Sequence, residues 1–111
     1  MFFLVMYRWT TDRKDALPVM PAHRVWTFDQ QKSGRMIASG PTPDYSTGIQ
    51  LFNAETFEEV EELCRNEPLV LAGHRTFEVI PWKVHAIFGF ALPRDEPPVE
   101  SPRAETSTPA P

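Results

Sequence analysis

The sequence predicts an α+β fold with four strands and two helices in the order β-α-β-β-α-β. Three observations predict it: an apolar run at residues 2–9, two amphipathic helical segments, and short alternating segments around them. This order is typical of the split βαβ, or ferredoxin-like, arrangement, in which helices cover one face of a four-stranded antiparallel sheet. The other face must be covered as well, and dimerisation is the usual way. We therefore expect a homodimer.

Four segments are predicted as strands. Residues 2–9 (FFLVMYRW) are almost wholly apolar, which indicates a central strand buried on both faces. Residues 35–40 and 48–54 are separated only by a loop rich in turn residues, so they should form an antiparallel hairpin. Residues 74–82 form the fourth strand, which should lie at an edge or end at Pro81, because proline lacks a donor. The following KVHAIFGFAL extends that strand, adds another, or covers a partner subunit.

The first helix should follow a polar loop at residues 10–18. It should begin near Pro18 or Pro21, since proline is tolerated in a first turn, and end near Ser33 and a left-handed Gly34. Apolar spacing then places one stripe on the sheet (Ala22, Val25 and Phe28) and another group well away from it (His23, Trp26 and Gln30).

The second helix has a clear start. Thr56 is its predicted N-cap, and Glu59 three residues later completes a capping box. Its apolar stripe includes Cys64, which predicts a core thiol rather than a nucleophile, and Pro68 should end the helix. The buried stripe comprises Phe57, Val60, Leu63 and Cys64, with Glu58, Glu61 and Glu62 facing water.

Composition divides the 111 residues into two parts. Residues 1–91 carry all the aromatic side chains and form the predicted domain, whereas the proline-rich residues 92–111 are predicted to be disordered because they can bury little apolar surface. The net charge of −4, with scattered basic residues, argues against nucleic-acid and anionic-membrane partners. The single cysteine suits a reducing cytoplasm, and the apolar start is too short for a signal peptide or membrane span.

Familiar motifs are absent from the sequence. It contains no phosphate-binding loop, no dinucleotide fingerprint and no nucleophile elbow. The three histidines have no short ligand spacing to one another or to Cys64, so we expect neither a metal site nor a cofactor. Acid–base chemistry or plain binding of a small molecule remains.

His23 is the leading candidate for acid–base chemistry, either at the rim of a pocket or on a solvated face. Two carboxylates are further candidates: Glu67, which could simply be a polar residue at a helix end, and Asp44, which could simply form a turn. His74 and Glu78 share a strand face and can reach one pocket. Trp9, Trp26 and Tyr45 are candidates for an apolar wall that binds substrate.

Read together, these pieces resemble the YCII-related (YciI-like) family from about Met1 to Trp82. The landmarks are the apolar first strand, PAH opening the first helix, GRMIASGP as the next strand, and TFEEVEELCRNEPLVLAGHRTFEVIPW as the second half. The resemblance implies a ferredoxin-like fold that dimerises into an α+β barrel, related to muconolactone isomerase. Members with known activity include a dehydrochlorinase acting on a chlorinated aromatic.

The resemblance also implies a site built on a His–Asp dyad. The family histidine matches His23, whereas the family aspartate falls at Glu67, so this sequence departs from the pattern there. Glutamate keeps the carboxylate and adds one methylene. Asp44, after GP, is a second candidate for the partner of His23.

The function predicted from these residues is a cofactor-free enzyme of the isomerase, lyase or cyclase type. His23 would move a proton on an aromatic or polyketide-like substrate, with a carboxylate fixing its tautomer. The alternatives are a non-catalytic ligand-binding or accessory protein, which the change from aspartate to Glu67 favours slightly, and a cofactor-independent monooxygenase.

Overall fold

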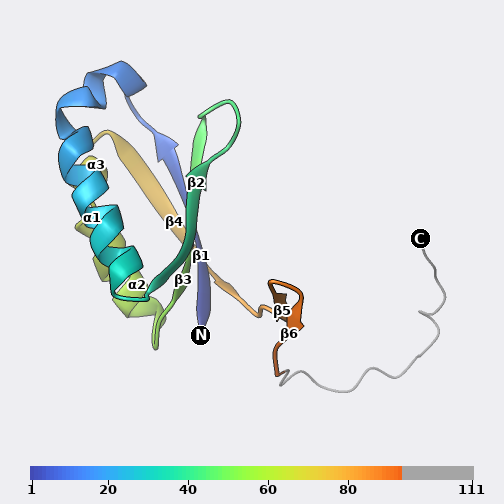
Figure 1. The fold of residues 1–111 in the computed structure, drawn as a ribbon. Coiled ribbons are helices and arrows are strands. Elements are labelled where there is room, and N and C mark those ends of the chain that lie inside the picture. Colours follow the sequence, from blue (N-terminus) through green and yellow to red (C-terminus); the bar gives the residue numbers. More distant parts are fainter. Residues whose placement is uncertain (94–111) are drawn as a thin grey trace.

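Four strands form one antiparallel sheet in the computed structural model of the protein, which describes residues 1–93 (Figure 1). The strands are β1 (Phe2–Trp9), β2 (Met36–Pro41), β3 (Thr47–Asn53) and β4 (Arg75–Trp82), in the spatial order β2-β3-β1-β4. The predicted α+β fold with its four-stranded antiparallel sheet is therefore confirmed. Of the tail predicted to be disordered, residues 94–111 lie outside the described residues.

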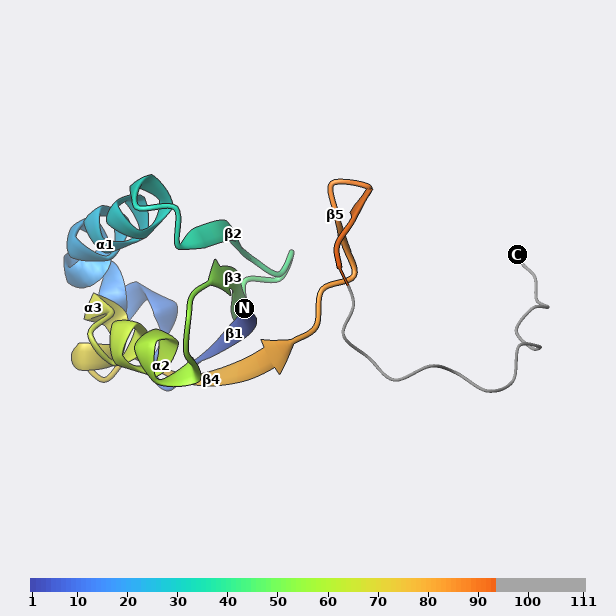
Figure 2. The same ribbon diagram turned by 90° about the horizontal axis from the view of Figure 1, so that it is seen from below.

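Helices cover one face of this sheet, as Figure 2 shows. They are α1 (Met20–Lys32), α2 (Phe57–Arg65) and the single turn α3 (Pro68–Leu71). A 3₁₀ helix, η1 (Arg13–Val19), occupies most of the segment that was expected to be a polar loop. None of the helices within residues 1–93 has the length and apolar character that a membrane span requires.

Strand β1 alternates strictly between its two faces. Phe3, Val5 and Tyr7 are buried beneath the helices, whereas Leu4 and Met6 are only half-buried on the opposite face. The sequence predicted burial on both faces, and within this chain only the helix-facing side is fully covered. The uncovered side remains apolar, because Leu4 lies opposite Leu51 and Met6 opposite Ile49 in the antiparallel register.

Helix α1 contradicts the predicted orientation. Val25 and Phe28 are 61% and 59% exposed, whereas Gln30 is buried and Trp26 packs edge-on against Phe52 in the core. The face that carries His23, Trp26 and Gln30 therefore lies on the sheet. The large indole buries more apolar area than a valine can, and it outweighs the three-residue spacing that the prediction rested on. Gly34 has a φ of +84°, so the left-handed residue after the helix is as predicted.

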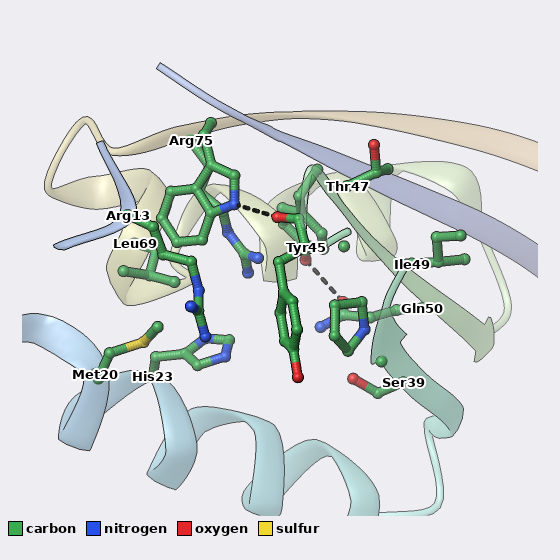
Figure 3. Close-up of a pocket in the computed structure, with 15 residues that line it drawn as sticks. Arg13, Met20, His23, Ser39, Tyr45, Thr47, Ile49, Gln50, Leu69 and Arg75 are labelled. Atoms are coloured by element: carbon green, nitrogen blue, oxygen red, sulfur yellow. Dashed lines mark hydrogen bonds between the residues drawn. The ribbon is translucent and has the colours of Figure 1, made fainter. Parts of the chain in front are cut away.

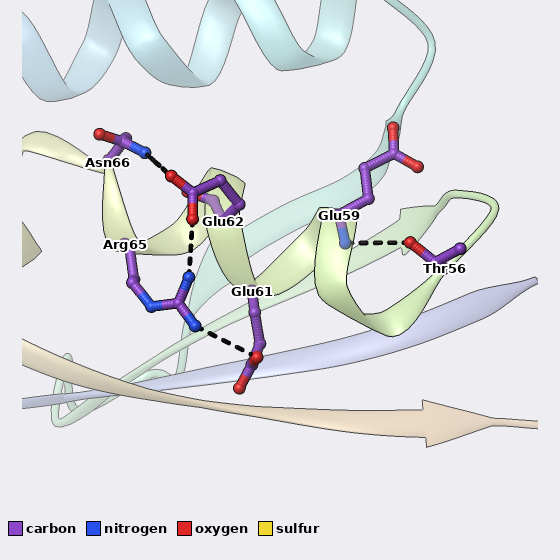
Figure 4. Close-up of polar contacts among 6 residues, drawn as sticks. All are labelled: Thr56, Glu59, Glu61, Glu62, Arg65 and Asn66. Atoms are coloured by element: carbon purple, nitrogen blue, oxygen red, sulfur yellow. Dashed lines mark hydrogen bonds and ion pairs between the residues drawn. The ribbon is translucent and has the colours of Figure 1, made fainter.

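Helix α2 begins and packs as the sequence predicts (Figure 4). The Glu59 N–H donates to the Thr56 hydroxyl at 3.1 Å, but the Glu59 carboxylate accepts from the Glu55 N–H, one residue earlier than in the standard box. Val60 and Cys64 are fully buried, which confirms the core thiol. On the outer face Arg65 bridges two glutamates, Glu61 and Glu62.

The chain turns sharply after α2. Pro68 does not simply end a helix, because it begins α3, and the turn closes at Gly73 with a φ of +81°. Strand β4 then runs along the sheet edge, as Pro81 predicted. Residues after it form a separate hairpin of β5 (Ala86–Ile87) and β6 (Phe90–Ala91), which projects beyond the end of β4 (Figure 1).

Candidate functional site

A cavity of about 180 Å³ lies between the helices and the sheet, near the carboxyl end of β1 (Figure 3). Its lining comes from all four long strands, from η1, α1 and α3, and from the loop between β2 and β3. One wall is aromatic, with Tyr7, Trp9 and Tyr45. An apolar space with a few convergent polar groups is the usual form of a small-molecule site.

His23 reaches this cavity from the first turns of α1. Its Nδ1 lies 2.7 Å from Glu67 Oε2, within hydrogen-bond distance, and its side chain is 20% exposed. Glu67 lies behind His23 rather than in the cavity lining, and its side chain is fully buried. The imidazole therefore stands between a buried carboxylate and the cavity.

Glu67 owes its position to the break between α2 and α3. Its N–H donates to the Cys64 carbonyl, and its own carbonyl accepts from the N–H groups of Val70 and Leu71. This backbone anchoring leaves little freedom to the side chain, whose two oxygens bind different partners. Oε2 faces His23, and Oε1 lies 3.1 Å from Nη2 of Arg75.

The carboxyl of Glu67 is ionised in this setting. Burial would raise the pKa of Glu67, but the hydrogen bond from His23 and the positive charge of Arg75 outweigh it, and the pKa lies below its ordinary value. An ionised carboxylate only accepts hydrogen bonds, so the Nδ1 of His23 must donate. In the neutral ring this leaves Nε2 as the unprotonated nitrogen.

Arg75 is the member of the site that the sequence analysis did not single out. It is only 8% exposed, and its guanidinium stacks 4.0 Å from the ring centre of Tyr7. Gly48 on β3 makes room for it, because a Cβ there would lie 3.0 Å from Nη1 of Arg75. A signal was available: Arg75 shares strand parity with Phe77 and Val79, so an arginine lies on the apolar, helix-facing side of β4.

The floor of the site contains a second polar group. The Tyr7 hydroxyl lies 2.8 Å from Gln50 Oε1 and 3.3 Å from Cys64 Sγ. Burial is the main cause that raises the pKa of Tyr7, and burial also raises the pKa of Cys64 to about 11. Both groups therefore stay protonated at neutral pH and serve as fixed polar contacts.

Two of the predicted wall residues line the cavity. Trp9 donates from Nε1 to the Tyr45 carbonyl at 3.1 Å, and this bond holds the β2–β3 loop against β1. Tyr45 has a φ of +62°, an uncommon conformation for a tyrosine, and Arg13 stacks 4.6 Å from its ring centre.

The other predicted site residues lie outside the cavity lining. Asp44 is exposed and caps its own loop, accepting from the Ser46 N–H and the Thr42 hydroxyl; these bonds lower its pKa to about 2. Trp26 packs into the core. His74 pairs through Nδ1 with the Thr11 hydroxyl at 2.9 Å.

Glu78 is also separated from this cavity. It is exposed on β4 opposite Met6, on the sheet face away from the helices. The sequence analysis put Glu78 and His74 on one strand face because they are an even number of residues apart. His74 precedes β4, however, so the alternation of the strand does not extend to His74. Of the carboxylates considered from the sequence, the structure brings Glu67 to His23 and leaves Asp44 and Glu78 elsewhere.

A comparison with known families places the chain in one of them. Residues 1–83 match the family model of the YCII-related domain. The chain belongs to the YCII-related domain family. The buried carboxylate behind His23 in this member is Glu67, and Arg75 binds its second oxygen.

Solved structures resemble this YCII-related chain in fold. One is 5-chloro-2-hydroxyhydroquinone dehydrochlorinase (TftG) from Burkholderia phenoliruptrix in complex with 2,5-dihydroxybenzoquinone, with a TM-score of 0.61 and 23% identity over 75% of this chain and 94% of that one. Another is protein Atu4242 from Agrobacterium tumefaciens, with a TM-score of 0.42 and 13% identity over 83% of this chain and 100% of that one. No curated protein matches the sequence.

Metal ligands do not gather in the part of the chain that the structure describes. Residues 1–93 contain no group of three or more histidine, cysteine or carboxylate side chains placed to hold a metal ion. The polar groups at the cavity include a histidine backed by a carboxylate, two arginines and two tyrosines, a set suited to proton transfer and to binding polar substrates.

Proposed function

We propose that this YCII-related protein is a cofactor-free acid–base catalyst of the isomerase, lyase or cyclase type. Its substrate is a small aromatic or polyketide-like molecule. The observation that carries the proposal is the 2.7 Å contact between His23 Nδ1 and Glu67 Oε2, made by a fully buried carboxylate behind a histidine that lines a cavity. This geometry leaves Nε2 of His23 available to a bound molecule.

The proposed reaction moves one proton between the substrate and His23. Nε2 of neutral His23 takes a proton from the substrate, and the resulting imidazolium is stabilised by the negative charge of Glu67. Return of the proton to another atom of the substrate gives an isomerisation. Departure of a leaving group such as chloride gives an elimination instead, and His23 then releases the proton to water. Arg75 keeps Glu67 ionised through the cycle.

The dimensions of the cavity support a substrate with one ring. Its volume of about 180 Å³ is similar to that of dry protein cavities of roughly 150 Å³ that bind benzene. Trp9 and Tyr45 supply apolar contact area beside His23. The fold-level likeness to a dehydrochlorinase bound to a dihydroxybenzoquinone is consistent with such a substrate, and we propose chlorinated hydroxyhydroquinones as the first compounds to test.

Turnover of these compounds by wild type and by His23→Asn tests the proposal. Purified protein would be incubated with a panel of chlorinated and hydroxylated aromatics, with chloride release and product masses recorded. We expect wild type to convert at least one compound, and His23→Asn to lose about 10²–10⁴-fold in rate. Conversion that persists in His23→Asn would contradict the assignment of the proton carrier.

Two outcomes of the same experiment favour the alternatives. Saturable binding without turnover across the panel indicates a ligand-binding or accessory protein. Turnover that stops under anaerobic conditions indicates a cofactor-independent monooxygenase. An elimination or isomerisation is indifferent to oxygen, so repeating the assay without oxygen separates these classes.

We also propose that the protein is a homodimer that covers the open face of its sheet. That face presents half-buried Leu4, Met6, Leu51 and Ile80 away from the helices. Such apolar side chains on an open sheet face are costly to leave in water, and a second copy offers an equivalent surface. The free Cys64 thiol and the lack of a membrane-spanning helix within residues 1–93 suit the cytoplasm, where we propose that the dimer works.

Sedimentation or light scattering tests the dimer with two matched variants. Leu4→Lys places a charge on the open face and should give monomers, whereas Val25→Lys places the same charge on the exposed side of α1 and should leave the dimer intact. If Val25→Lys dissociates the dimer instead, the interface lies on the helices.

A further inference from the structure

We propose that the cavity selects a small planar substrate carrying an oxyanion, a carboxylate or an acidic hydroxyl, and that Arg75 and Arg13 bind this group beside His23. This inference rests on the proposed function and names the substrate class of the same site. Three observations support it: the positive charge of the cavity lining, the N–H groups of Arg75 that lack a partner, and the position of Arg13.

The cavity is electropositive, although the protein carries a net charge of −4. Fifteen residues line it; they include two arginines and His23, and none is an aspartate or glutamate. Glu67 lies behind His23 and neutralises only one of the two guanidinium groups. One positive charge therefore remains at the cavity when His23 is neutral, and an anionic ligand would balance it.

Arg75 retains hydrogen-bonding capacity inside the protein. Its Nη2 is bound to Glu67, and its Nη1 makes no hydrogen bond to the described residues; Nε also lacks a partner there, but it is buried beneath the cavity surface. A buried donor without a partner is costly, and a guanidinium has five N–H groups to satisfy. Figure 3 shows this side chain directed into the cavity, where an oxygen of a ligand would meet it.

Arg13 also lines the cavity, from η1. It is exposed on η1, and its guanidinium is held against the ring of Tyr45, 4.6 Å from the ring centre. In Figure 3 Arg13, His23 and Arg75 point into the same space from three different elements. A ring between Trp9 and Tyr45 that carries an oxyanion would place its charge between the two arginines and its reacting atoms near His23.

Calorimetric titration with benzoate and benzamide tests the proposal, because the two probes are nearly isosteric and differ in charge. We expect benzoate to bind at least about tenfold more tightly than benzamide, with an affinity that falls as salt is added. Arg13→Gln should reduce the preference severalfold. Arg35→Gln, which removes the same charge from a remote exposed residue paired with Glu59, should leave it unchanged.

The role of Arg75 needs a variant that keeps its charge, since loss of this buried guanidinium endangers folding. Gly48→Ala places a methyl group 3.0 Å from Nη1 of Arg75. It should displace the guanidinium of Arg75 without removing its positive charge. We expect it to weaken benzoate more than benzamide. Equal affinity of the two probes in wild type, binding of neither, or equal effects of Arg13→Gln and Arg35→Gln would overturn the proposal.

Titrating His23→Asn separates this inference from the proposed reaction. If the variant keeps the preference for benzoate, oxyanion recognition stands whatever the outcome of the turnover assays. If wild type turns over neutral aromatics and shows no preference for benzoate, acid–base catalysis stands and oxyanion recognition falls.

Discussion

Arg75 Nη2 lies 3.1 Å from Glu67 Oε1, and the two side chains are only 7% and 0% exposed. Removing one partner of a buried ion pair leaves the other charge uncompensated, so we expect Arg75→Gln to lower the free energy of unfolding by about 3–5 kcal/mol. Urea denaturation followed by tryptophan fluorescence measures this. Arg65→Gln is the control, because its exposed pairs with Glu61 and Glu62 are expected to contribute only about 0.2–1 kcal/mol. Equal losses in the two variants would contradict a special role for the buried pair.

Acid should destabilise the protein through Glu67. The pKa of Glu67 in the folded protein lies below its ordinary value of 4.5, so folding favours the ionised form. Its contribution to stability is complete above that ordinary value and is lost as the pH falls through the lower folded pKa. We expect the unfolding free energy of wild type to fall more steeply between about pH 5 and about pH 3 than that of Glu67→Gln. Parallel curves would show that Glu67 contributes no such linkage; Asp44, whose pKa is also lowered, is common to both proteins.

The tautomer of His23 should depend on the length and the charge of residue 67. In wild type we expect neutral His23 to carry its proton on Nδ1, since Glu67 can only accept. Glu67→Asp keeps the charge, but one methylene fewer prevents simultaneous contacts of 2.7 Å to His23 and 3.1 Å to Arg75. Glu67→Gln keeps the length and adds a donor. Nitrogen-15 NMR of labelled histidine should therefore report one tautomer of His23 in wild type and mixtures in both variants. A single Nδ1–H tautomer in all three proteins would show that Glu67 does not determine the tautomer.

The orientation of α1 can be tested by truncating its two faces. Trp26 packs against Phe52 in the core, whereas Val25 is 61% exposed. We expect Trp26→Ala to cost about 2 kcal/mol or more, and Val25→Ala to stay within about 0.5 kcal/mol of wild type. Thermal and chemical denaturation provide both values. A larger loss for Val25→Ala than for Trp26→Ala would show that the face with Val25 packs on the sheet, as the sequence spacing predicted.

Cys64 should react with thiol reagents only when the protein opens. Burial raises its pKa to about 11 from 9.0, and the Tyr7 hydroxyl is bound at 3.3 Å from its sulfur. Two pKa units alone reduce the thiolate fraction about 100-fold at neutral pH. A disulfide reagent should therefore modify native protein at least about 100-fold more slowly than protein unfolded in urea. Rapid labelling of the native protein would show that the thiol is accessible.

Local signals in the sequence predicted most of the framework. The apolar run of residues 2–9, the Thr56 cap and the left-handed Gly34 each depend on near neighbours in the chain, and each lies where it was expected. The family pattern also pointed to His23 and Glu67, which are 44 residues apart and could not be paired by spacing alone.

Features that depend on tertiary packing were harder to predict. The face of α1 was assigned from the positions of Val25 and Phe28, whereas the sheet takes Trp26 and Gln30. Arg75 escaped notice because its importance comes from a distant glutamate and from the space left by Gly48. Asp44 was a candidate because it is a loop carboxylate that follows GP, yet its hydrogen bonds remain within its own loop.

The two sides of the cavity come from separate stretches of the chain. His23 and its buried partner belong to α1 and the α2–α3 junction, whereas Ser39, Pro41 and Tyr45 on the facing wall belong to β2 and the loop after it. The shape of this wall is thus encoded apart from the proposed proton-transfer pair. Replacing residues 39–45 would change the shape of this wall and leave His23 and Glu67 untouched, so a small library confined to this hairpin could diversify the molecules that reach the base we propose.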